Sequence, residues 1–400
     1  MPRTVQHSYC ARGPWFSRAV ILFAGCLCFL PGKLKAAPKP HPAPASIPTV
    51  IRVESESWWP TSGSSDRKDY AGTTACFPCH SRKVMQQRET SMARAAERAI
   101  DSPDLKSHSD LALRIGPYDY ELQLKHGEAM LTVSDGIGST IKDLEWAVGD
   151  GLFGQTYVYQ EHGKFYESQL SFYSRINGLA TTTGHMEPHT LETAAGGLTS
   201  SDMIRQCFGC HFTTATTNHG FDPEHAITGI TCEACHGPGE KHVQQKSGPK
   251  QAVEDKRQLI MNPAALKPAD SVDFCGACHR TAADAVLSGL AGKGLIDVRL
   301  QPYRLEKSKC WGEGDARLTC IACHDPHVQL VTDAGSYDAK CLSCHAAAAS
   351  SSSSRRISSC KVGTRDCANC HMPKIEVPGT YTTFTDHWIR IVRPGDAYPD

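Results

Sequence analysis

The sequence predicts a mainly α-helical fold with much irregular structure and a small antiparallel β insertion at about residues 115–175. Two observations lead to this fold class. A short motif, CxxCH, recurs along the chain, and after residue 200 the segments between its copies are short helical or irregular stretches. Residues 118–133 and 155–173 instead alternate aromatic and β-branched residues with polar ones, which is the pattern of half-buried strands.

The two alternating segments each contain a His-Gly pair near the middle, at His126 and at His162. Histidine tolerates the backbone conformation of a tight turn, and glycine favours it. We therefore expect two hairpins that form a small sheet of about 60 residues, with both histidines serving turn geometry. His108, in KSHSD, is expected at a helix boundary.

The first 36 residues have the three parts of an export signal. A basic segment precedes the apolar run AVILFAGCLCFL, and PGKLKA supplies small residues for cleavage near Ala36. The apolar run has twelve residues, too few to span a bilayer. We therefore expect an exported, periplasmic protein. The alternative is a lipoprotein or membrane-associated form, because Cys26 follows small residues, as lipid attachment requires.

Three further segments have a distinct composition. Residues 37–69 are rich in proline and serine, which predicts an extended tether, with folded structure beginning near Asp69. Residues 81–100 are strong helix formers and directly follow the first CxxCH motif. The tract AAAASSSSS at 346–354 has no periodicity and predicts a solvated loop.

The charge balance excludes nucleic acid as an expected partner. The chain has 42 basic and 42 acidic residues, and the first 36 residues hold five of the basic ones and none of the acidic ones. The remainder, with 37 basic and 42 acidic residues, is mildly acidic, whereas proteins that bind nucleic acid present basic surfaces.

The CxxCH motif is the pattern by which c-type haem is attached. Its two thiols can form thioethers with the haem vinyl groups, and the following histidine is placed to bind the iron. Zinc knuckles and redox CxxC pairs need no histidine directly after the second cysteine, yet each CxxC pair here has one. We therefore expect seven covalently bound c-type haems. The seven motifs comprise Cys76, Cys79 and His80; Cys207, Cys210 and His211; Cys232, Cys235 and His236; Cys275, Cys278 and His279; Cys320, Cys323 and His324; Cys341, Cys344 and His345; and Cys367, Cys370 and His371.

A haem iron takes a second axial ligand, and its identity decides what the haem can do. Histidine on both sides closes the iron for electron transfer, whereas an open side can bind a small substrate. Seven histidines outside the motifs remain as candidates, a number equal to that of the expected irons. Met92 is an eighth candidate and would raise the potential of its haem, although ordinary helix packing explains it equally well. The candidate distal ligands are His185, His189, His219, His225, His242, His327, His387 and Met92.

Spacing along the chain constrains these candidates. His327 lies three residues after His324 and is too near to reach the far face of the haem that His324 holds. It should therefore reach a neighbouring haem, and the same reasoning applies less strictly to His242. Motif starts only 25 residues apart, at Cys207 and Cys232, leave little protein between the macrocycles. We therefore expect stacked haems to form much of the core.

Two cysteines behind the export signal lie outside the motifs, at Cys310 and Cys360. In an oxidising compartment a disulfide between them is the expected outcome. The alternative is that Cys310 ligates a haem.

From about Tyr70 to Asp400 the sequence resembles multihaem cytochromes c of the cytochrome c-554 type. This resemblance implies periplasmic electron carriers whose haems stack in close pairs with largely bis-histidine ligation. It also implies His242, His327 and His387 as distal ligands. Related chains often have histidine where this one has Met92. The stretches that carry the resemblance are GITCEACHGPGEKHV (229–243), VDFCGACHR (272–280), DARLTCIACHDPHVQLV (315–331), CLSCH (341–345), CANCHMPK (367–374) and TDHWIR (385–390).

These features together predict a periplasmic seven-haem cytochrome that passes electrons between a redox protein donor and acceptor. The first alternative is a multihaem oxidoreductase with one open-coordinate haem that acts on a small nitrogen or sulfur compound, although no CxxCK motif occurs. The second is a haem-bearing docking subunit of a membrane-associated complex. The expected organisation is a signal peptide at 1–36, a Pro/Ser-rich tether at 37–69, a first haem module at 70–110, a β-hairpin insertion at 111–180 and a six-haem cytochrome c domain at 181–400.

Overall fold

The computed structural model describes residues 66–217, 220–248, 259–311, 318–346 and 360–393. All of these belong to the second of two compact units, which begins at Ala43. The expected export signal, the tether before residue 66 and most of the 346–354 tract therefore lie outside the described residues. None of the helices described has the length and apolar character that a membrane span requires.

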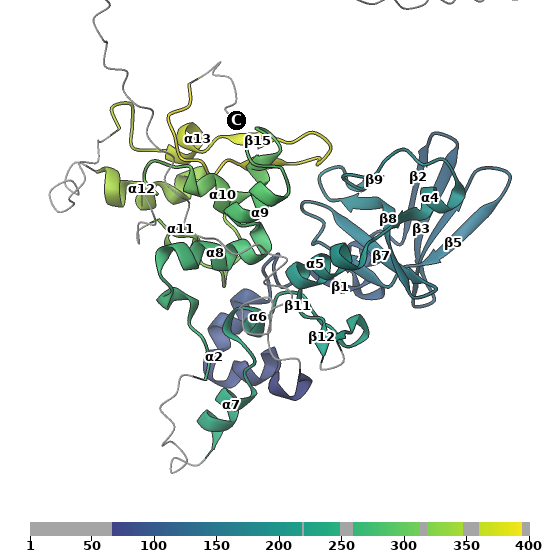
Figure 1. Ribbon diagram of the computed structural model, residues 1–400, viewed down its shortest axis with the longest axis horizontal. Helices are drawn as coiled ribbons and strands as arrows, with labels where there is room; N and C mark the ends of the chain where they lie inside the picture. The colour runs from purple at the N-terminus through teal and green to yellow at the C-terminus, as the bar shows by residue number, and fades with distance from the viewer. Residues whose placement is uncertain (1–65, 218–219, 249–258, 312–317, 347–359, 394–400) are drawn as a thin grey trace, which may run out of the picture. The chain divides into compact units, whose positions relative to one another are not determined.

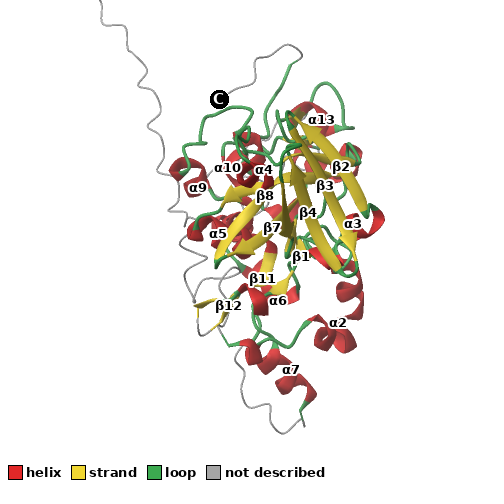
Figure 2. Ribbon diagram, turned by 90° about the vertical axis from the view of Figure 1, so that its right-hand side faces the viewer, coloured by secondary structure: helices red, strands yellow, loops and turns green. Residues whose placement is uncertain are grey.

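The predicted fold class, mainly α with a small β insertion, is wrong because it underestimates the share of β-strand. Helix accounts for 37% of the described residues and strand for 23%, in several antiparallel sheets. The β region is a two-sheet assembly and not a small insertion (Figures 1 and 2). Four of its strands lie outside the region that alternates in sequence, two before it and two after it, and the outermost of them, at 96–98 and 196–198, are only three residues long.

A four-stranded antiparallel sheet and a six-stranded antiparallel sheet make up this β region. The four-stranded sheet follows chain order, while the larger sheet runs β1-β6-β7-β8-β10 with β9 also paired to β8. The strands of the first are β2 (Asp110–Ile115), β3 (Tyr118–Lys125), β4 (Glu128–Ser134) and β5 (Ser139–Asp143); those of the second are β1 (Ala96–Arg98), β6 (Trp146–Val148), β7 (Gln155–Glu161), β8 (Lys164–Tyr173), β9 (Gly178–Thr181) and β10 (Gly196–Leu198).

One aromatic core holds the two sheets together. Tyr120 and Leu131 from the four-stranded sheet pack in the same buried cluster as Tyr157, Tyr159 and Phe172 from the six-stranded sheet. Strand β3 alternates buried and exposed positions as its sequence predicts, whereas the second half of β8 is buried on both faces. The second face of the larger sheet is therefore occupied as well, by the helix that carries the second CxxCH motif.

Both predicted hairpins are present. Strand β3 pairs with β4 through Lys125 opposite Glu128, and β7 pairs with β8 through Glu161 opposite Lys164. The intervening His126 and His162 have φ values of 55° and 50°, and the glycine after each also has positive φ. Two successive residues at positive φ form the turn that suits the twist of a hairpin. The interpretation of these two histidines as turn residues is confirmed.

The helix predicted over residues 81–100 is wrong in its second half. Helix α2 (Thr73–Gln87) ends before Thr90, whose hydroxyl donates to the Gln87 carbonyl and accepts from the Ala93 amide. Such side-chain bonds to backbone compete with the helix. Beyond them Ala96 pairs with Val148 at the edge of the larger sheet. Tertiary pairing therefore overrides the helix propensity of this segment.

The rest of the structure consists of short helices and two- or three-residue strand pairs (Figure 1). Its α-helices are α3 (Pro103–Ser107), α4 (Leu191–Ala195), α5 (Ser201–His211), α6 (Cys232–His236), α7 (Glu240–Ser247), α8 (Pro268–His279), α9 (Ala282–Leu287), α10 (Gln301–Glu306), α11 (Cys320–Cys323), α12 (Asp338–His345) and α13 (Cys367–His371). Its 3₁₀ helices are η1 (Arg67–Asp69), η2 (Ala99–Asp101), η3 (Pro223–His225), η5 (Pro263–Ala265), η6 (Asp297–Arg299) and η7 (Ala334–Tyr337). Its strand pairs are β11 (Phe212–Thr214) with β14 (Ile227–Thr228), β12 (Thr216–Thr217) with β13 (Gly220–Phe221), and β15 (Lys374–Glu376) with β16 (Thr383–Thr385).

Phe208 joins the larger sheet to the second CxxCH motif. It follows Cys207 on α5, is 1% exposed, stacks on Phe212 with ring centroids 4.2 Å apart and meets Trp146 edge-on at 5.5 Å. Phe77 occupies the same position in the first motif but is 44% exposed. The CxxCH motif therefore does not require a buried residue at this position. Phe208 is buried because it packs against the larger sheet.

We expect Phe208→Ala to lower the free energy of unfolding by about 3–5 kcal/mol, because it empties a fully packed aromatic site. Phe77→Ala is the matched control and should lower it by less than about 1 kcal/mol. Guanidinium unfolding followed by far-ultraviolet circular dichroism measures both. Equal losses for the two variants would contradict this account of the packing.

Candidate functional site

Each CxxCH motif lies on a helical turn. Six helices contain a complete motif, and α11 contains the two cysteines of the fifth motif and ends just before His324. In a helix, residues at positions i, i+3 and i+4 lie on one face. The first cysteine, the second cysteine and the histidine of each motif have this spacing, so the helix turns all three side chains to one side in five motifs. The backbone of His80 and of His324 departs from helical geometry, and both side chains still line the common cavity. This is the arrangement that attachment of one planar cofactor requires.

A single cavity of about 4740 Å³ runs along these helices, and the cysteines and histidine of all seven motifs line it. A cavity for one small-molecule ligand has about 300–1,000 Å³. The space is therefore large enough for several ligands side by side. After residue 230 the buried apolar cluster described for this part of the chain is small and centres on Val272, Leu305 and Trp311.

Charged side chains around the cavity are predominantly basic. Among the described residues that line it, twelve are lysine or arginine and four are aspartate or glutamate. This excess contrasts with the overall charge of the chain and indicates that the cavity accepts anionic groups. Haem carries two propionate carboxylates, so the chemistry of the wall fits it. The basic residues are Lys83, Lys246, Arg280, Arg299, Lys307, Lys309, Lys340, Lys361, Arg365, Lys374, Arg390 and Arg393; the acidic ones are Asp150, Glu167, Glu233 and Asp325.

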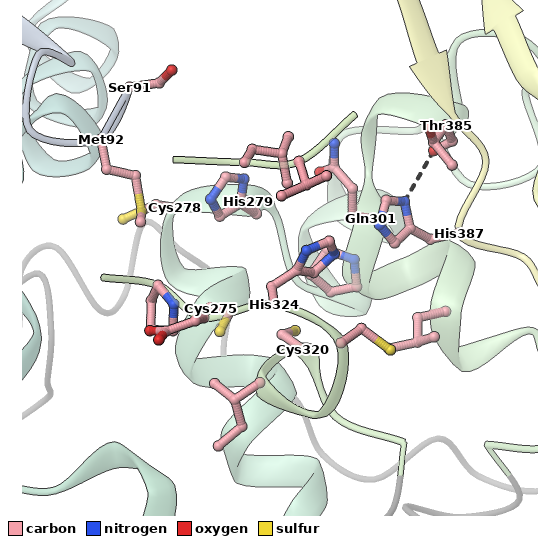
Figure 3. A pocket seen from close by; sticks show the side chains of 18 of the residues that line it. Ser91, Met92, Cys275, Cys278, His279, Gln301, Cys320, His324, Thr385 and His387 are labelled. Carbon is pink, nitrogen blue, oxygen red and sulfur yellow. Dashed lines mark hydrogen bonds between the residues drawn. The ribbon is translucent and has the colours of Figure 1, made fainter. Parts of the chain in front are cut away.

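Two motif histidines face a histidine from elsewhere in the chain. The rings of His236 and His327 have centroids 6.1 Å apart and planes 21° apart. Those of His324 and His387 have centroids 6.3 Å apart and planes 45° apart (Figure 3). Two imidazoles that bind one metal ion from opposite sides, each with a metal–nitrogen bond of about 2 Å, hold their centroids roughly 6 Å apart. Both pairs therefore have the spacing of trans axial ligands.

Hydrogen bonds fix the orientation of several of these rings. A carbonyl or carboxylate oxygen only accepts, so in each case Nδ1 carries the proton and donates, which leaves Nε2 as the free ligand atom. Metal-binding histidines are held by partners of this kind. The bonds run from His211 to Ala95 O (3.0 Å), His236 to Met261 O (2.8 Å), His371 to Arg390 O (2.8 Å), His387 to Thr385 O (3.0 Å) and His327 to Asp325 Oδ1 (2.8 Å).

Burial keeps four of the cavity imidazoles neutral. It lowers the pKa of His211, His279 and His324, and it lowers the pKa of His387 to about 4, with the nearby His324 adding to the effect. Desolvation disfavours the charged imidazolium. A neutral imidazole is the form that binds a metal, so these rings are ready to act as ligands at neutral pH.

The motifs contact one another through their thiols. The hydrogen bond that Cys232 shares with Cys76 lowers the pKa of the Cys232 thiol to about 7. Through contacts of this kind each of the seven motifs is joined to at least one other, so their attachment points form a connected series along the cavity. The thiols near enough to alter each other's pKa are Cys76 with Cys232, Cys210 with Cys278, Cys275 with Cys320, Cys341 with Cys367, Cys235 with Cys278 and Cys323 with Cys341.

Glu233, between the two cysteines of the third motif, joins that motif to the first one. Its buried carboxylate accepts hydrogen bonds from the amides of Ala71 (2.8 Å) and Gly72 (3.0 Å), at the start of α2, which lacks a side-chain cap. It also accepts from Gly239 (2.7 Å), in the turn that leads to His242. The turn itself depends on Gly237, whose φ is 91°. His242 lines the cavity and interacts electrostatically with His80.

The other predicted distal ligands lie elsewhere. Both ring nitrogens of His185 are engaged, with Gln169 Oε1 at 2.9 Å and Glu167 Oε2 at 3.1 Å. His225 is exposed and bonded to Asp222. Neither of these residues nor His189 is part of the cavity wall as the structure describes it. His219 lies outside the described residues.

Met92 lines the cavity together with Cys278 and His279 (Figure 3). The sequence predicts that Met92 lies within a helix. In the structure it lies in a turn after the end of α2. Cys310 and Cys360 also line the cavity and are exposed. Their pairing in a disulfide stays a prediction, as does iron ligation by Met92.

Sequence reasoning missed the groups that position the ligands. The acceptors for His211, His236 and His371 are backbone carbonyls. Every residue has such a carbonyl, so the sequence cannot identify the ones that accept these bonds. Glu233 could have been noticed as a charged residue inside a motif whose other members bind a cofactor. Its partners, 161 and 162 residues earlier in the chain, could not.

Comparison with known proteins agrees with this site. Residues 166–237, which include the motifs at Cys207 and Cys232, match the family model described as cytochrome c554 and c-prime. The chain is 32% identical over 83 residues to cytochrome c-554 of Nitrosomonas europaea, an alignment that covers 19% of this chain and 34% of that protein. The resemblance to the cytochrome c-554 family is confirmed. The chain thus spans about a third of the length of this curated relative.

The outer cell wall cytochrome OcwA, a crystal structure, aligns over 82% of this chain and 80% of its own, with 16% sequence identity and a TM-score of 0.41. The residues that match the family model include two complete CxxCH motifs, the attachment pattern of c-type haem. Cytochromes of the c-554 type are typically periplasmic.

Glu306, the last residue of α10, gives the protein a pH-dependent stability. Burial raises the pKa of its carboxyl to about 7, and nearby Asp273 adds to the effect. Between about pH 4.5 and pH 7 the folded state holds a proton that the unfolded state has lost. The stability contribution is therefore fully present at low pH and is lost as the pH rises through 7.

We expect Glu306→Gln to be more stable than the wild type at pH 8, by up to about 3 kcal/mol, and about equal to it at pH 4, because one pKa unit corresponds to about 1.4 kcal/mol. Glu376→Gln, on the exposed side of β15, should show no such difference. Guanidinium unfolding at the two pH values measures the effect. A Glu306→Gln variant less stable than the wild type at pH 8 would contradict it.

Proposed function

We propose that this chain is an exported cytochrome with seven covalently bound c-type haems, which passes electrons between redox protein partners. The observation that carries the proposal is the single cavity lined by all seven CxxCH motifs. A thioether from each cysteine and an axial bond from each motif histidine would hold one haem per motif. Haem supplies the redox centre, and the protein tunes its potential through ligand, burial and charge.

We assign three axial pairs. His236 with His327 and His324 with His387 have the spacing of trans ligands. His80 with His242 is the third pair: both line the cavity, and His80 is near enough to contribute to the lowered pKa of His242. Iron held by histidine on both sides has no open position for a substrate and is suited to electron transfer.

Two further observations support transport of electrons along the cavity. Thiols of neighbouring motifs lie near enough to alter each other's pKa, and this proximity is what close packing of neighbouring cofactors would require. The twelve basic side chains on the wall would pair with propionates. Such pairing lets several anionic cofactors share one space without an excess of negative charge.

A multihaem oxidoreductase is the second candidate. It is favoured because the described cavity wall offers fewer candidate distal ligands than motif histidines. Among the described residues of the cavity wall, the candidate distal ligands are three histidines and Met92, against seven motif histidines. His211 lies on the part of the wall formed by the larger sheet and Arg280. A haem left open there could bind a small nitrogen or sulfur compound.

We expect intact-mass measurement of the mature protein to give seven haems per chain. The double variant Cys341→Ala/Cys344→Ala should carry six, because one attachment site is lost. Cys310→Ser, which changes a cysteine outside the motifs, should retain seven. A wild-type mass with fewer than seven haems would overturn the stoichiometry.

Spectroscopy of the ferric protein separates the two candidate functions. A carrier closed on every iron should give only low-spin signals and take up no cyanide, nitrite or carbon monoxide. A high-spin signal that disappears when one of these ligands binds would overturn the pure carrier and support the oxidoreductase.

A further inference from the structure

The axial candidate His387 is carried by a segment without regular secondary structure, directly after β16. Its ring nevertheless faces His324 at 6.3 Å, with Nδ1 fixed on Thr385 O at 3.0 Å. Fixing an irregular segment costs backbone and side-chain entropy. Another part of the structure must supply that constraint, and the residues on either side of His387 show which part does.

Asp386, the preceding residue, is fully buried and held by two arginines. Two nitrogens of the Arg304 guanidinium donate to it, Nε to Oδ1 at 2.9 Å and Nη2 to Oδ2 at 2.8 Å. Arg390 also donates to Oδ2, and the amide of Trp388 donates to Oδ1 at 3.0 Å. The carboxylate therefore fixes the backbone both before and after His387.

Arg304 is in turn fixed by its own helix and by a second carboxylate. Its side chain is fully buried on α10, and its Nη1 lies 2.9 Å from Asp297 Oδ1. The next residue, Leu305, packs in one cluster with Val272 of α8, the helix of the fourth motif. Arg304 thus ties the His387 segment to the helical frame of the cavity.

Ser308 supplies a second link between the same two segments. Its hydroxyl donates to the His387 carbonyl at 3.3 Å and accepts from the Ile389 amide at 2.8 Å. It lies just after the end of α10. The backbone on both sides of the imidazole is therefore held by the α10 segment.

The energetics indicate that this network serves geometry more than stability. Removing an ion from water costs several kcal/mol, and well-packed apolar residues of similar volume are often at least as stable as a buried ion pair. What a guanidinium provides beyond stability is a planar fork that fixes the orientation of a carboxylate. Lysine has the same charge but lacks that fork.

We propose that Arg304 is a positioning residue: through Asp386 it holds the His387 imidazole at ligand distance from the haem iron that His324 binds. This inference rests on the proposed function, in which His324 and His387 share one iron. Arg304 touches neither ring according to the hydrogen bonds described for it, and it acts through the backbone of residues 386–388.

The test compares the ferric spectra of three haem-loaded variants. Arg304→Lys keeps the charge and loses the bidentate contact, so one low-spin haem should become high-spin, and added imidazole should restore the low-spin signal. His387→Ala should lose the same signal. Arg114→Lys is the control, because Arg114 also binds both oxygens of an aspartate, through Nη1 to Asp119 Oδ1 at 3.0 Å and Oδ2 at 2.9 Å, but on the exposed surface of the β2–β3 pair. It should change nothing.

The outcomes separate the inference from the function on which it rests. If His387→Ala loses one low-spin signal and Arg304→Lys keeps them all, the positioning role is overturned and the axial pair stands. If His387→Ala keeps every signal, the axial pair itself is overturned. Where Arg304→Lys fails to accumulate with haem, Asp386→Asn tests the same contact: a high-spin signal restored by imidazole supports the role, and an unchanged spectrum overturns it.

Discussion

The space along the CxxCH helices is the constraint on which the rest of the helical part depends. Each motif sets two thiols and one imidazole on one face of a short helix, and these faces line a common cavity of about 4740 Å³. The side-chain core described after residue 230 is small, and helices of four to fifteen residues are marginal without tertiary packing. In our account the proposed haems supply the missing apolar surface, so that cofactor attachment and folding are coupled.

Buried carboxylates then decide how the segments around the cavity meet. Glu233 joins the third motif to the start of α2 and to the turn before His242. Asp386 joins the His387 segment to α10 through Arg304. In both cases a carboxylate lies within a residue or two of a haem-binding or candidate haem-binding side chain, and its partners come from distant sequence. A buried carboxylate thus links distant segments at both places. Backbone amides donate to Glu233, and a guanidinium donates to Asp386.

Local signals in the sequence predicted what local physics determines. The CxxCH spacing identified the cofactor class, and the His-Gly pairs at His126 and His162 identified two hairpin turns. The balance of the fold could not be predicted in this way, because β1 is a three-residue strand in helix-forming sequence that exists only by pairing with β6. The pairing of His327 with His236 was likewise beyond the sequence, since spacing excluded one haem for His327 without choosing among the others. Arg304 gave no signal, because nothing in its neighbourhood along the chain marks it as buried.

We propose that seven haems fill the cavity and that the irons of three of them lie between the assigned histidine pairs. Anomalous diffraction at the iron absorption edge, from crystals of the mature protein, tests it most directly because it locates each iron independently of the polypeptide. The account predicts seven iron peaks within the cavity, one of them between His236 and His327 and another between His324 and His387. Fewer peaks, or no iron between either pair of rings, would contradict it.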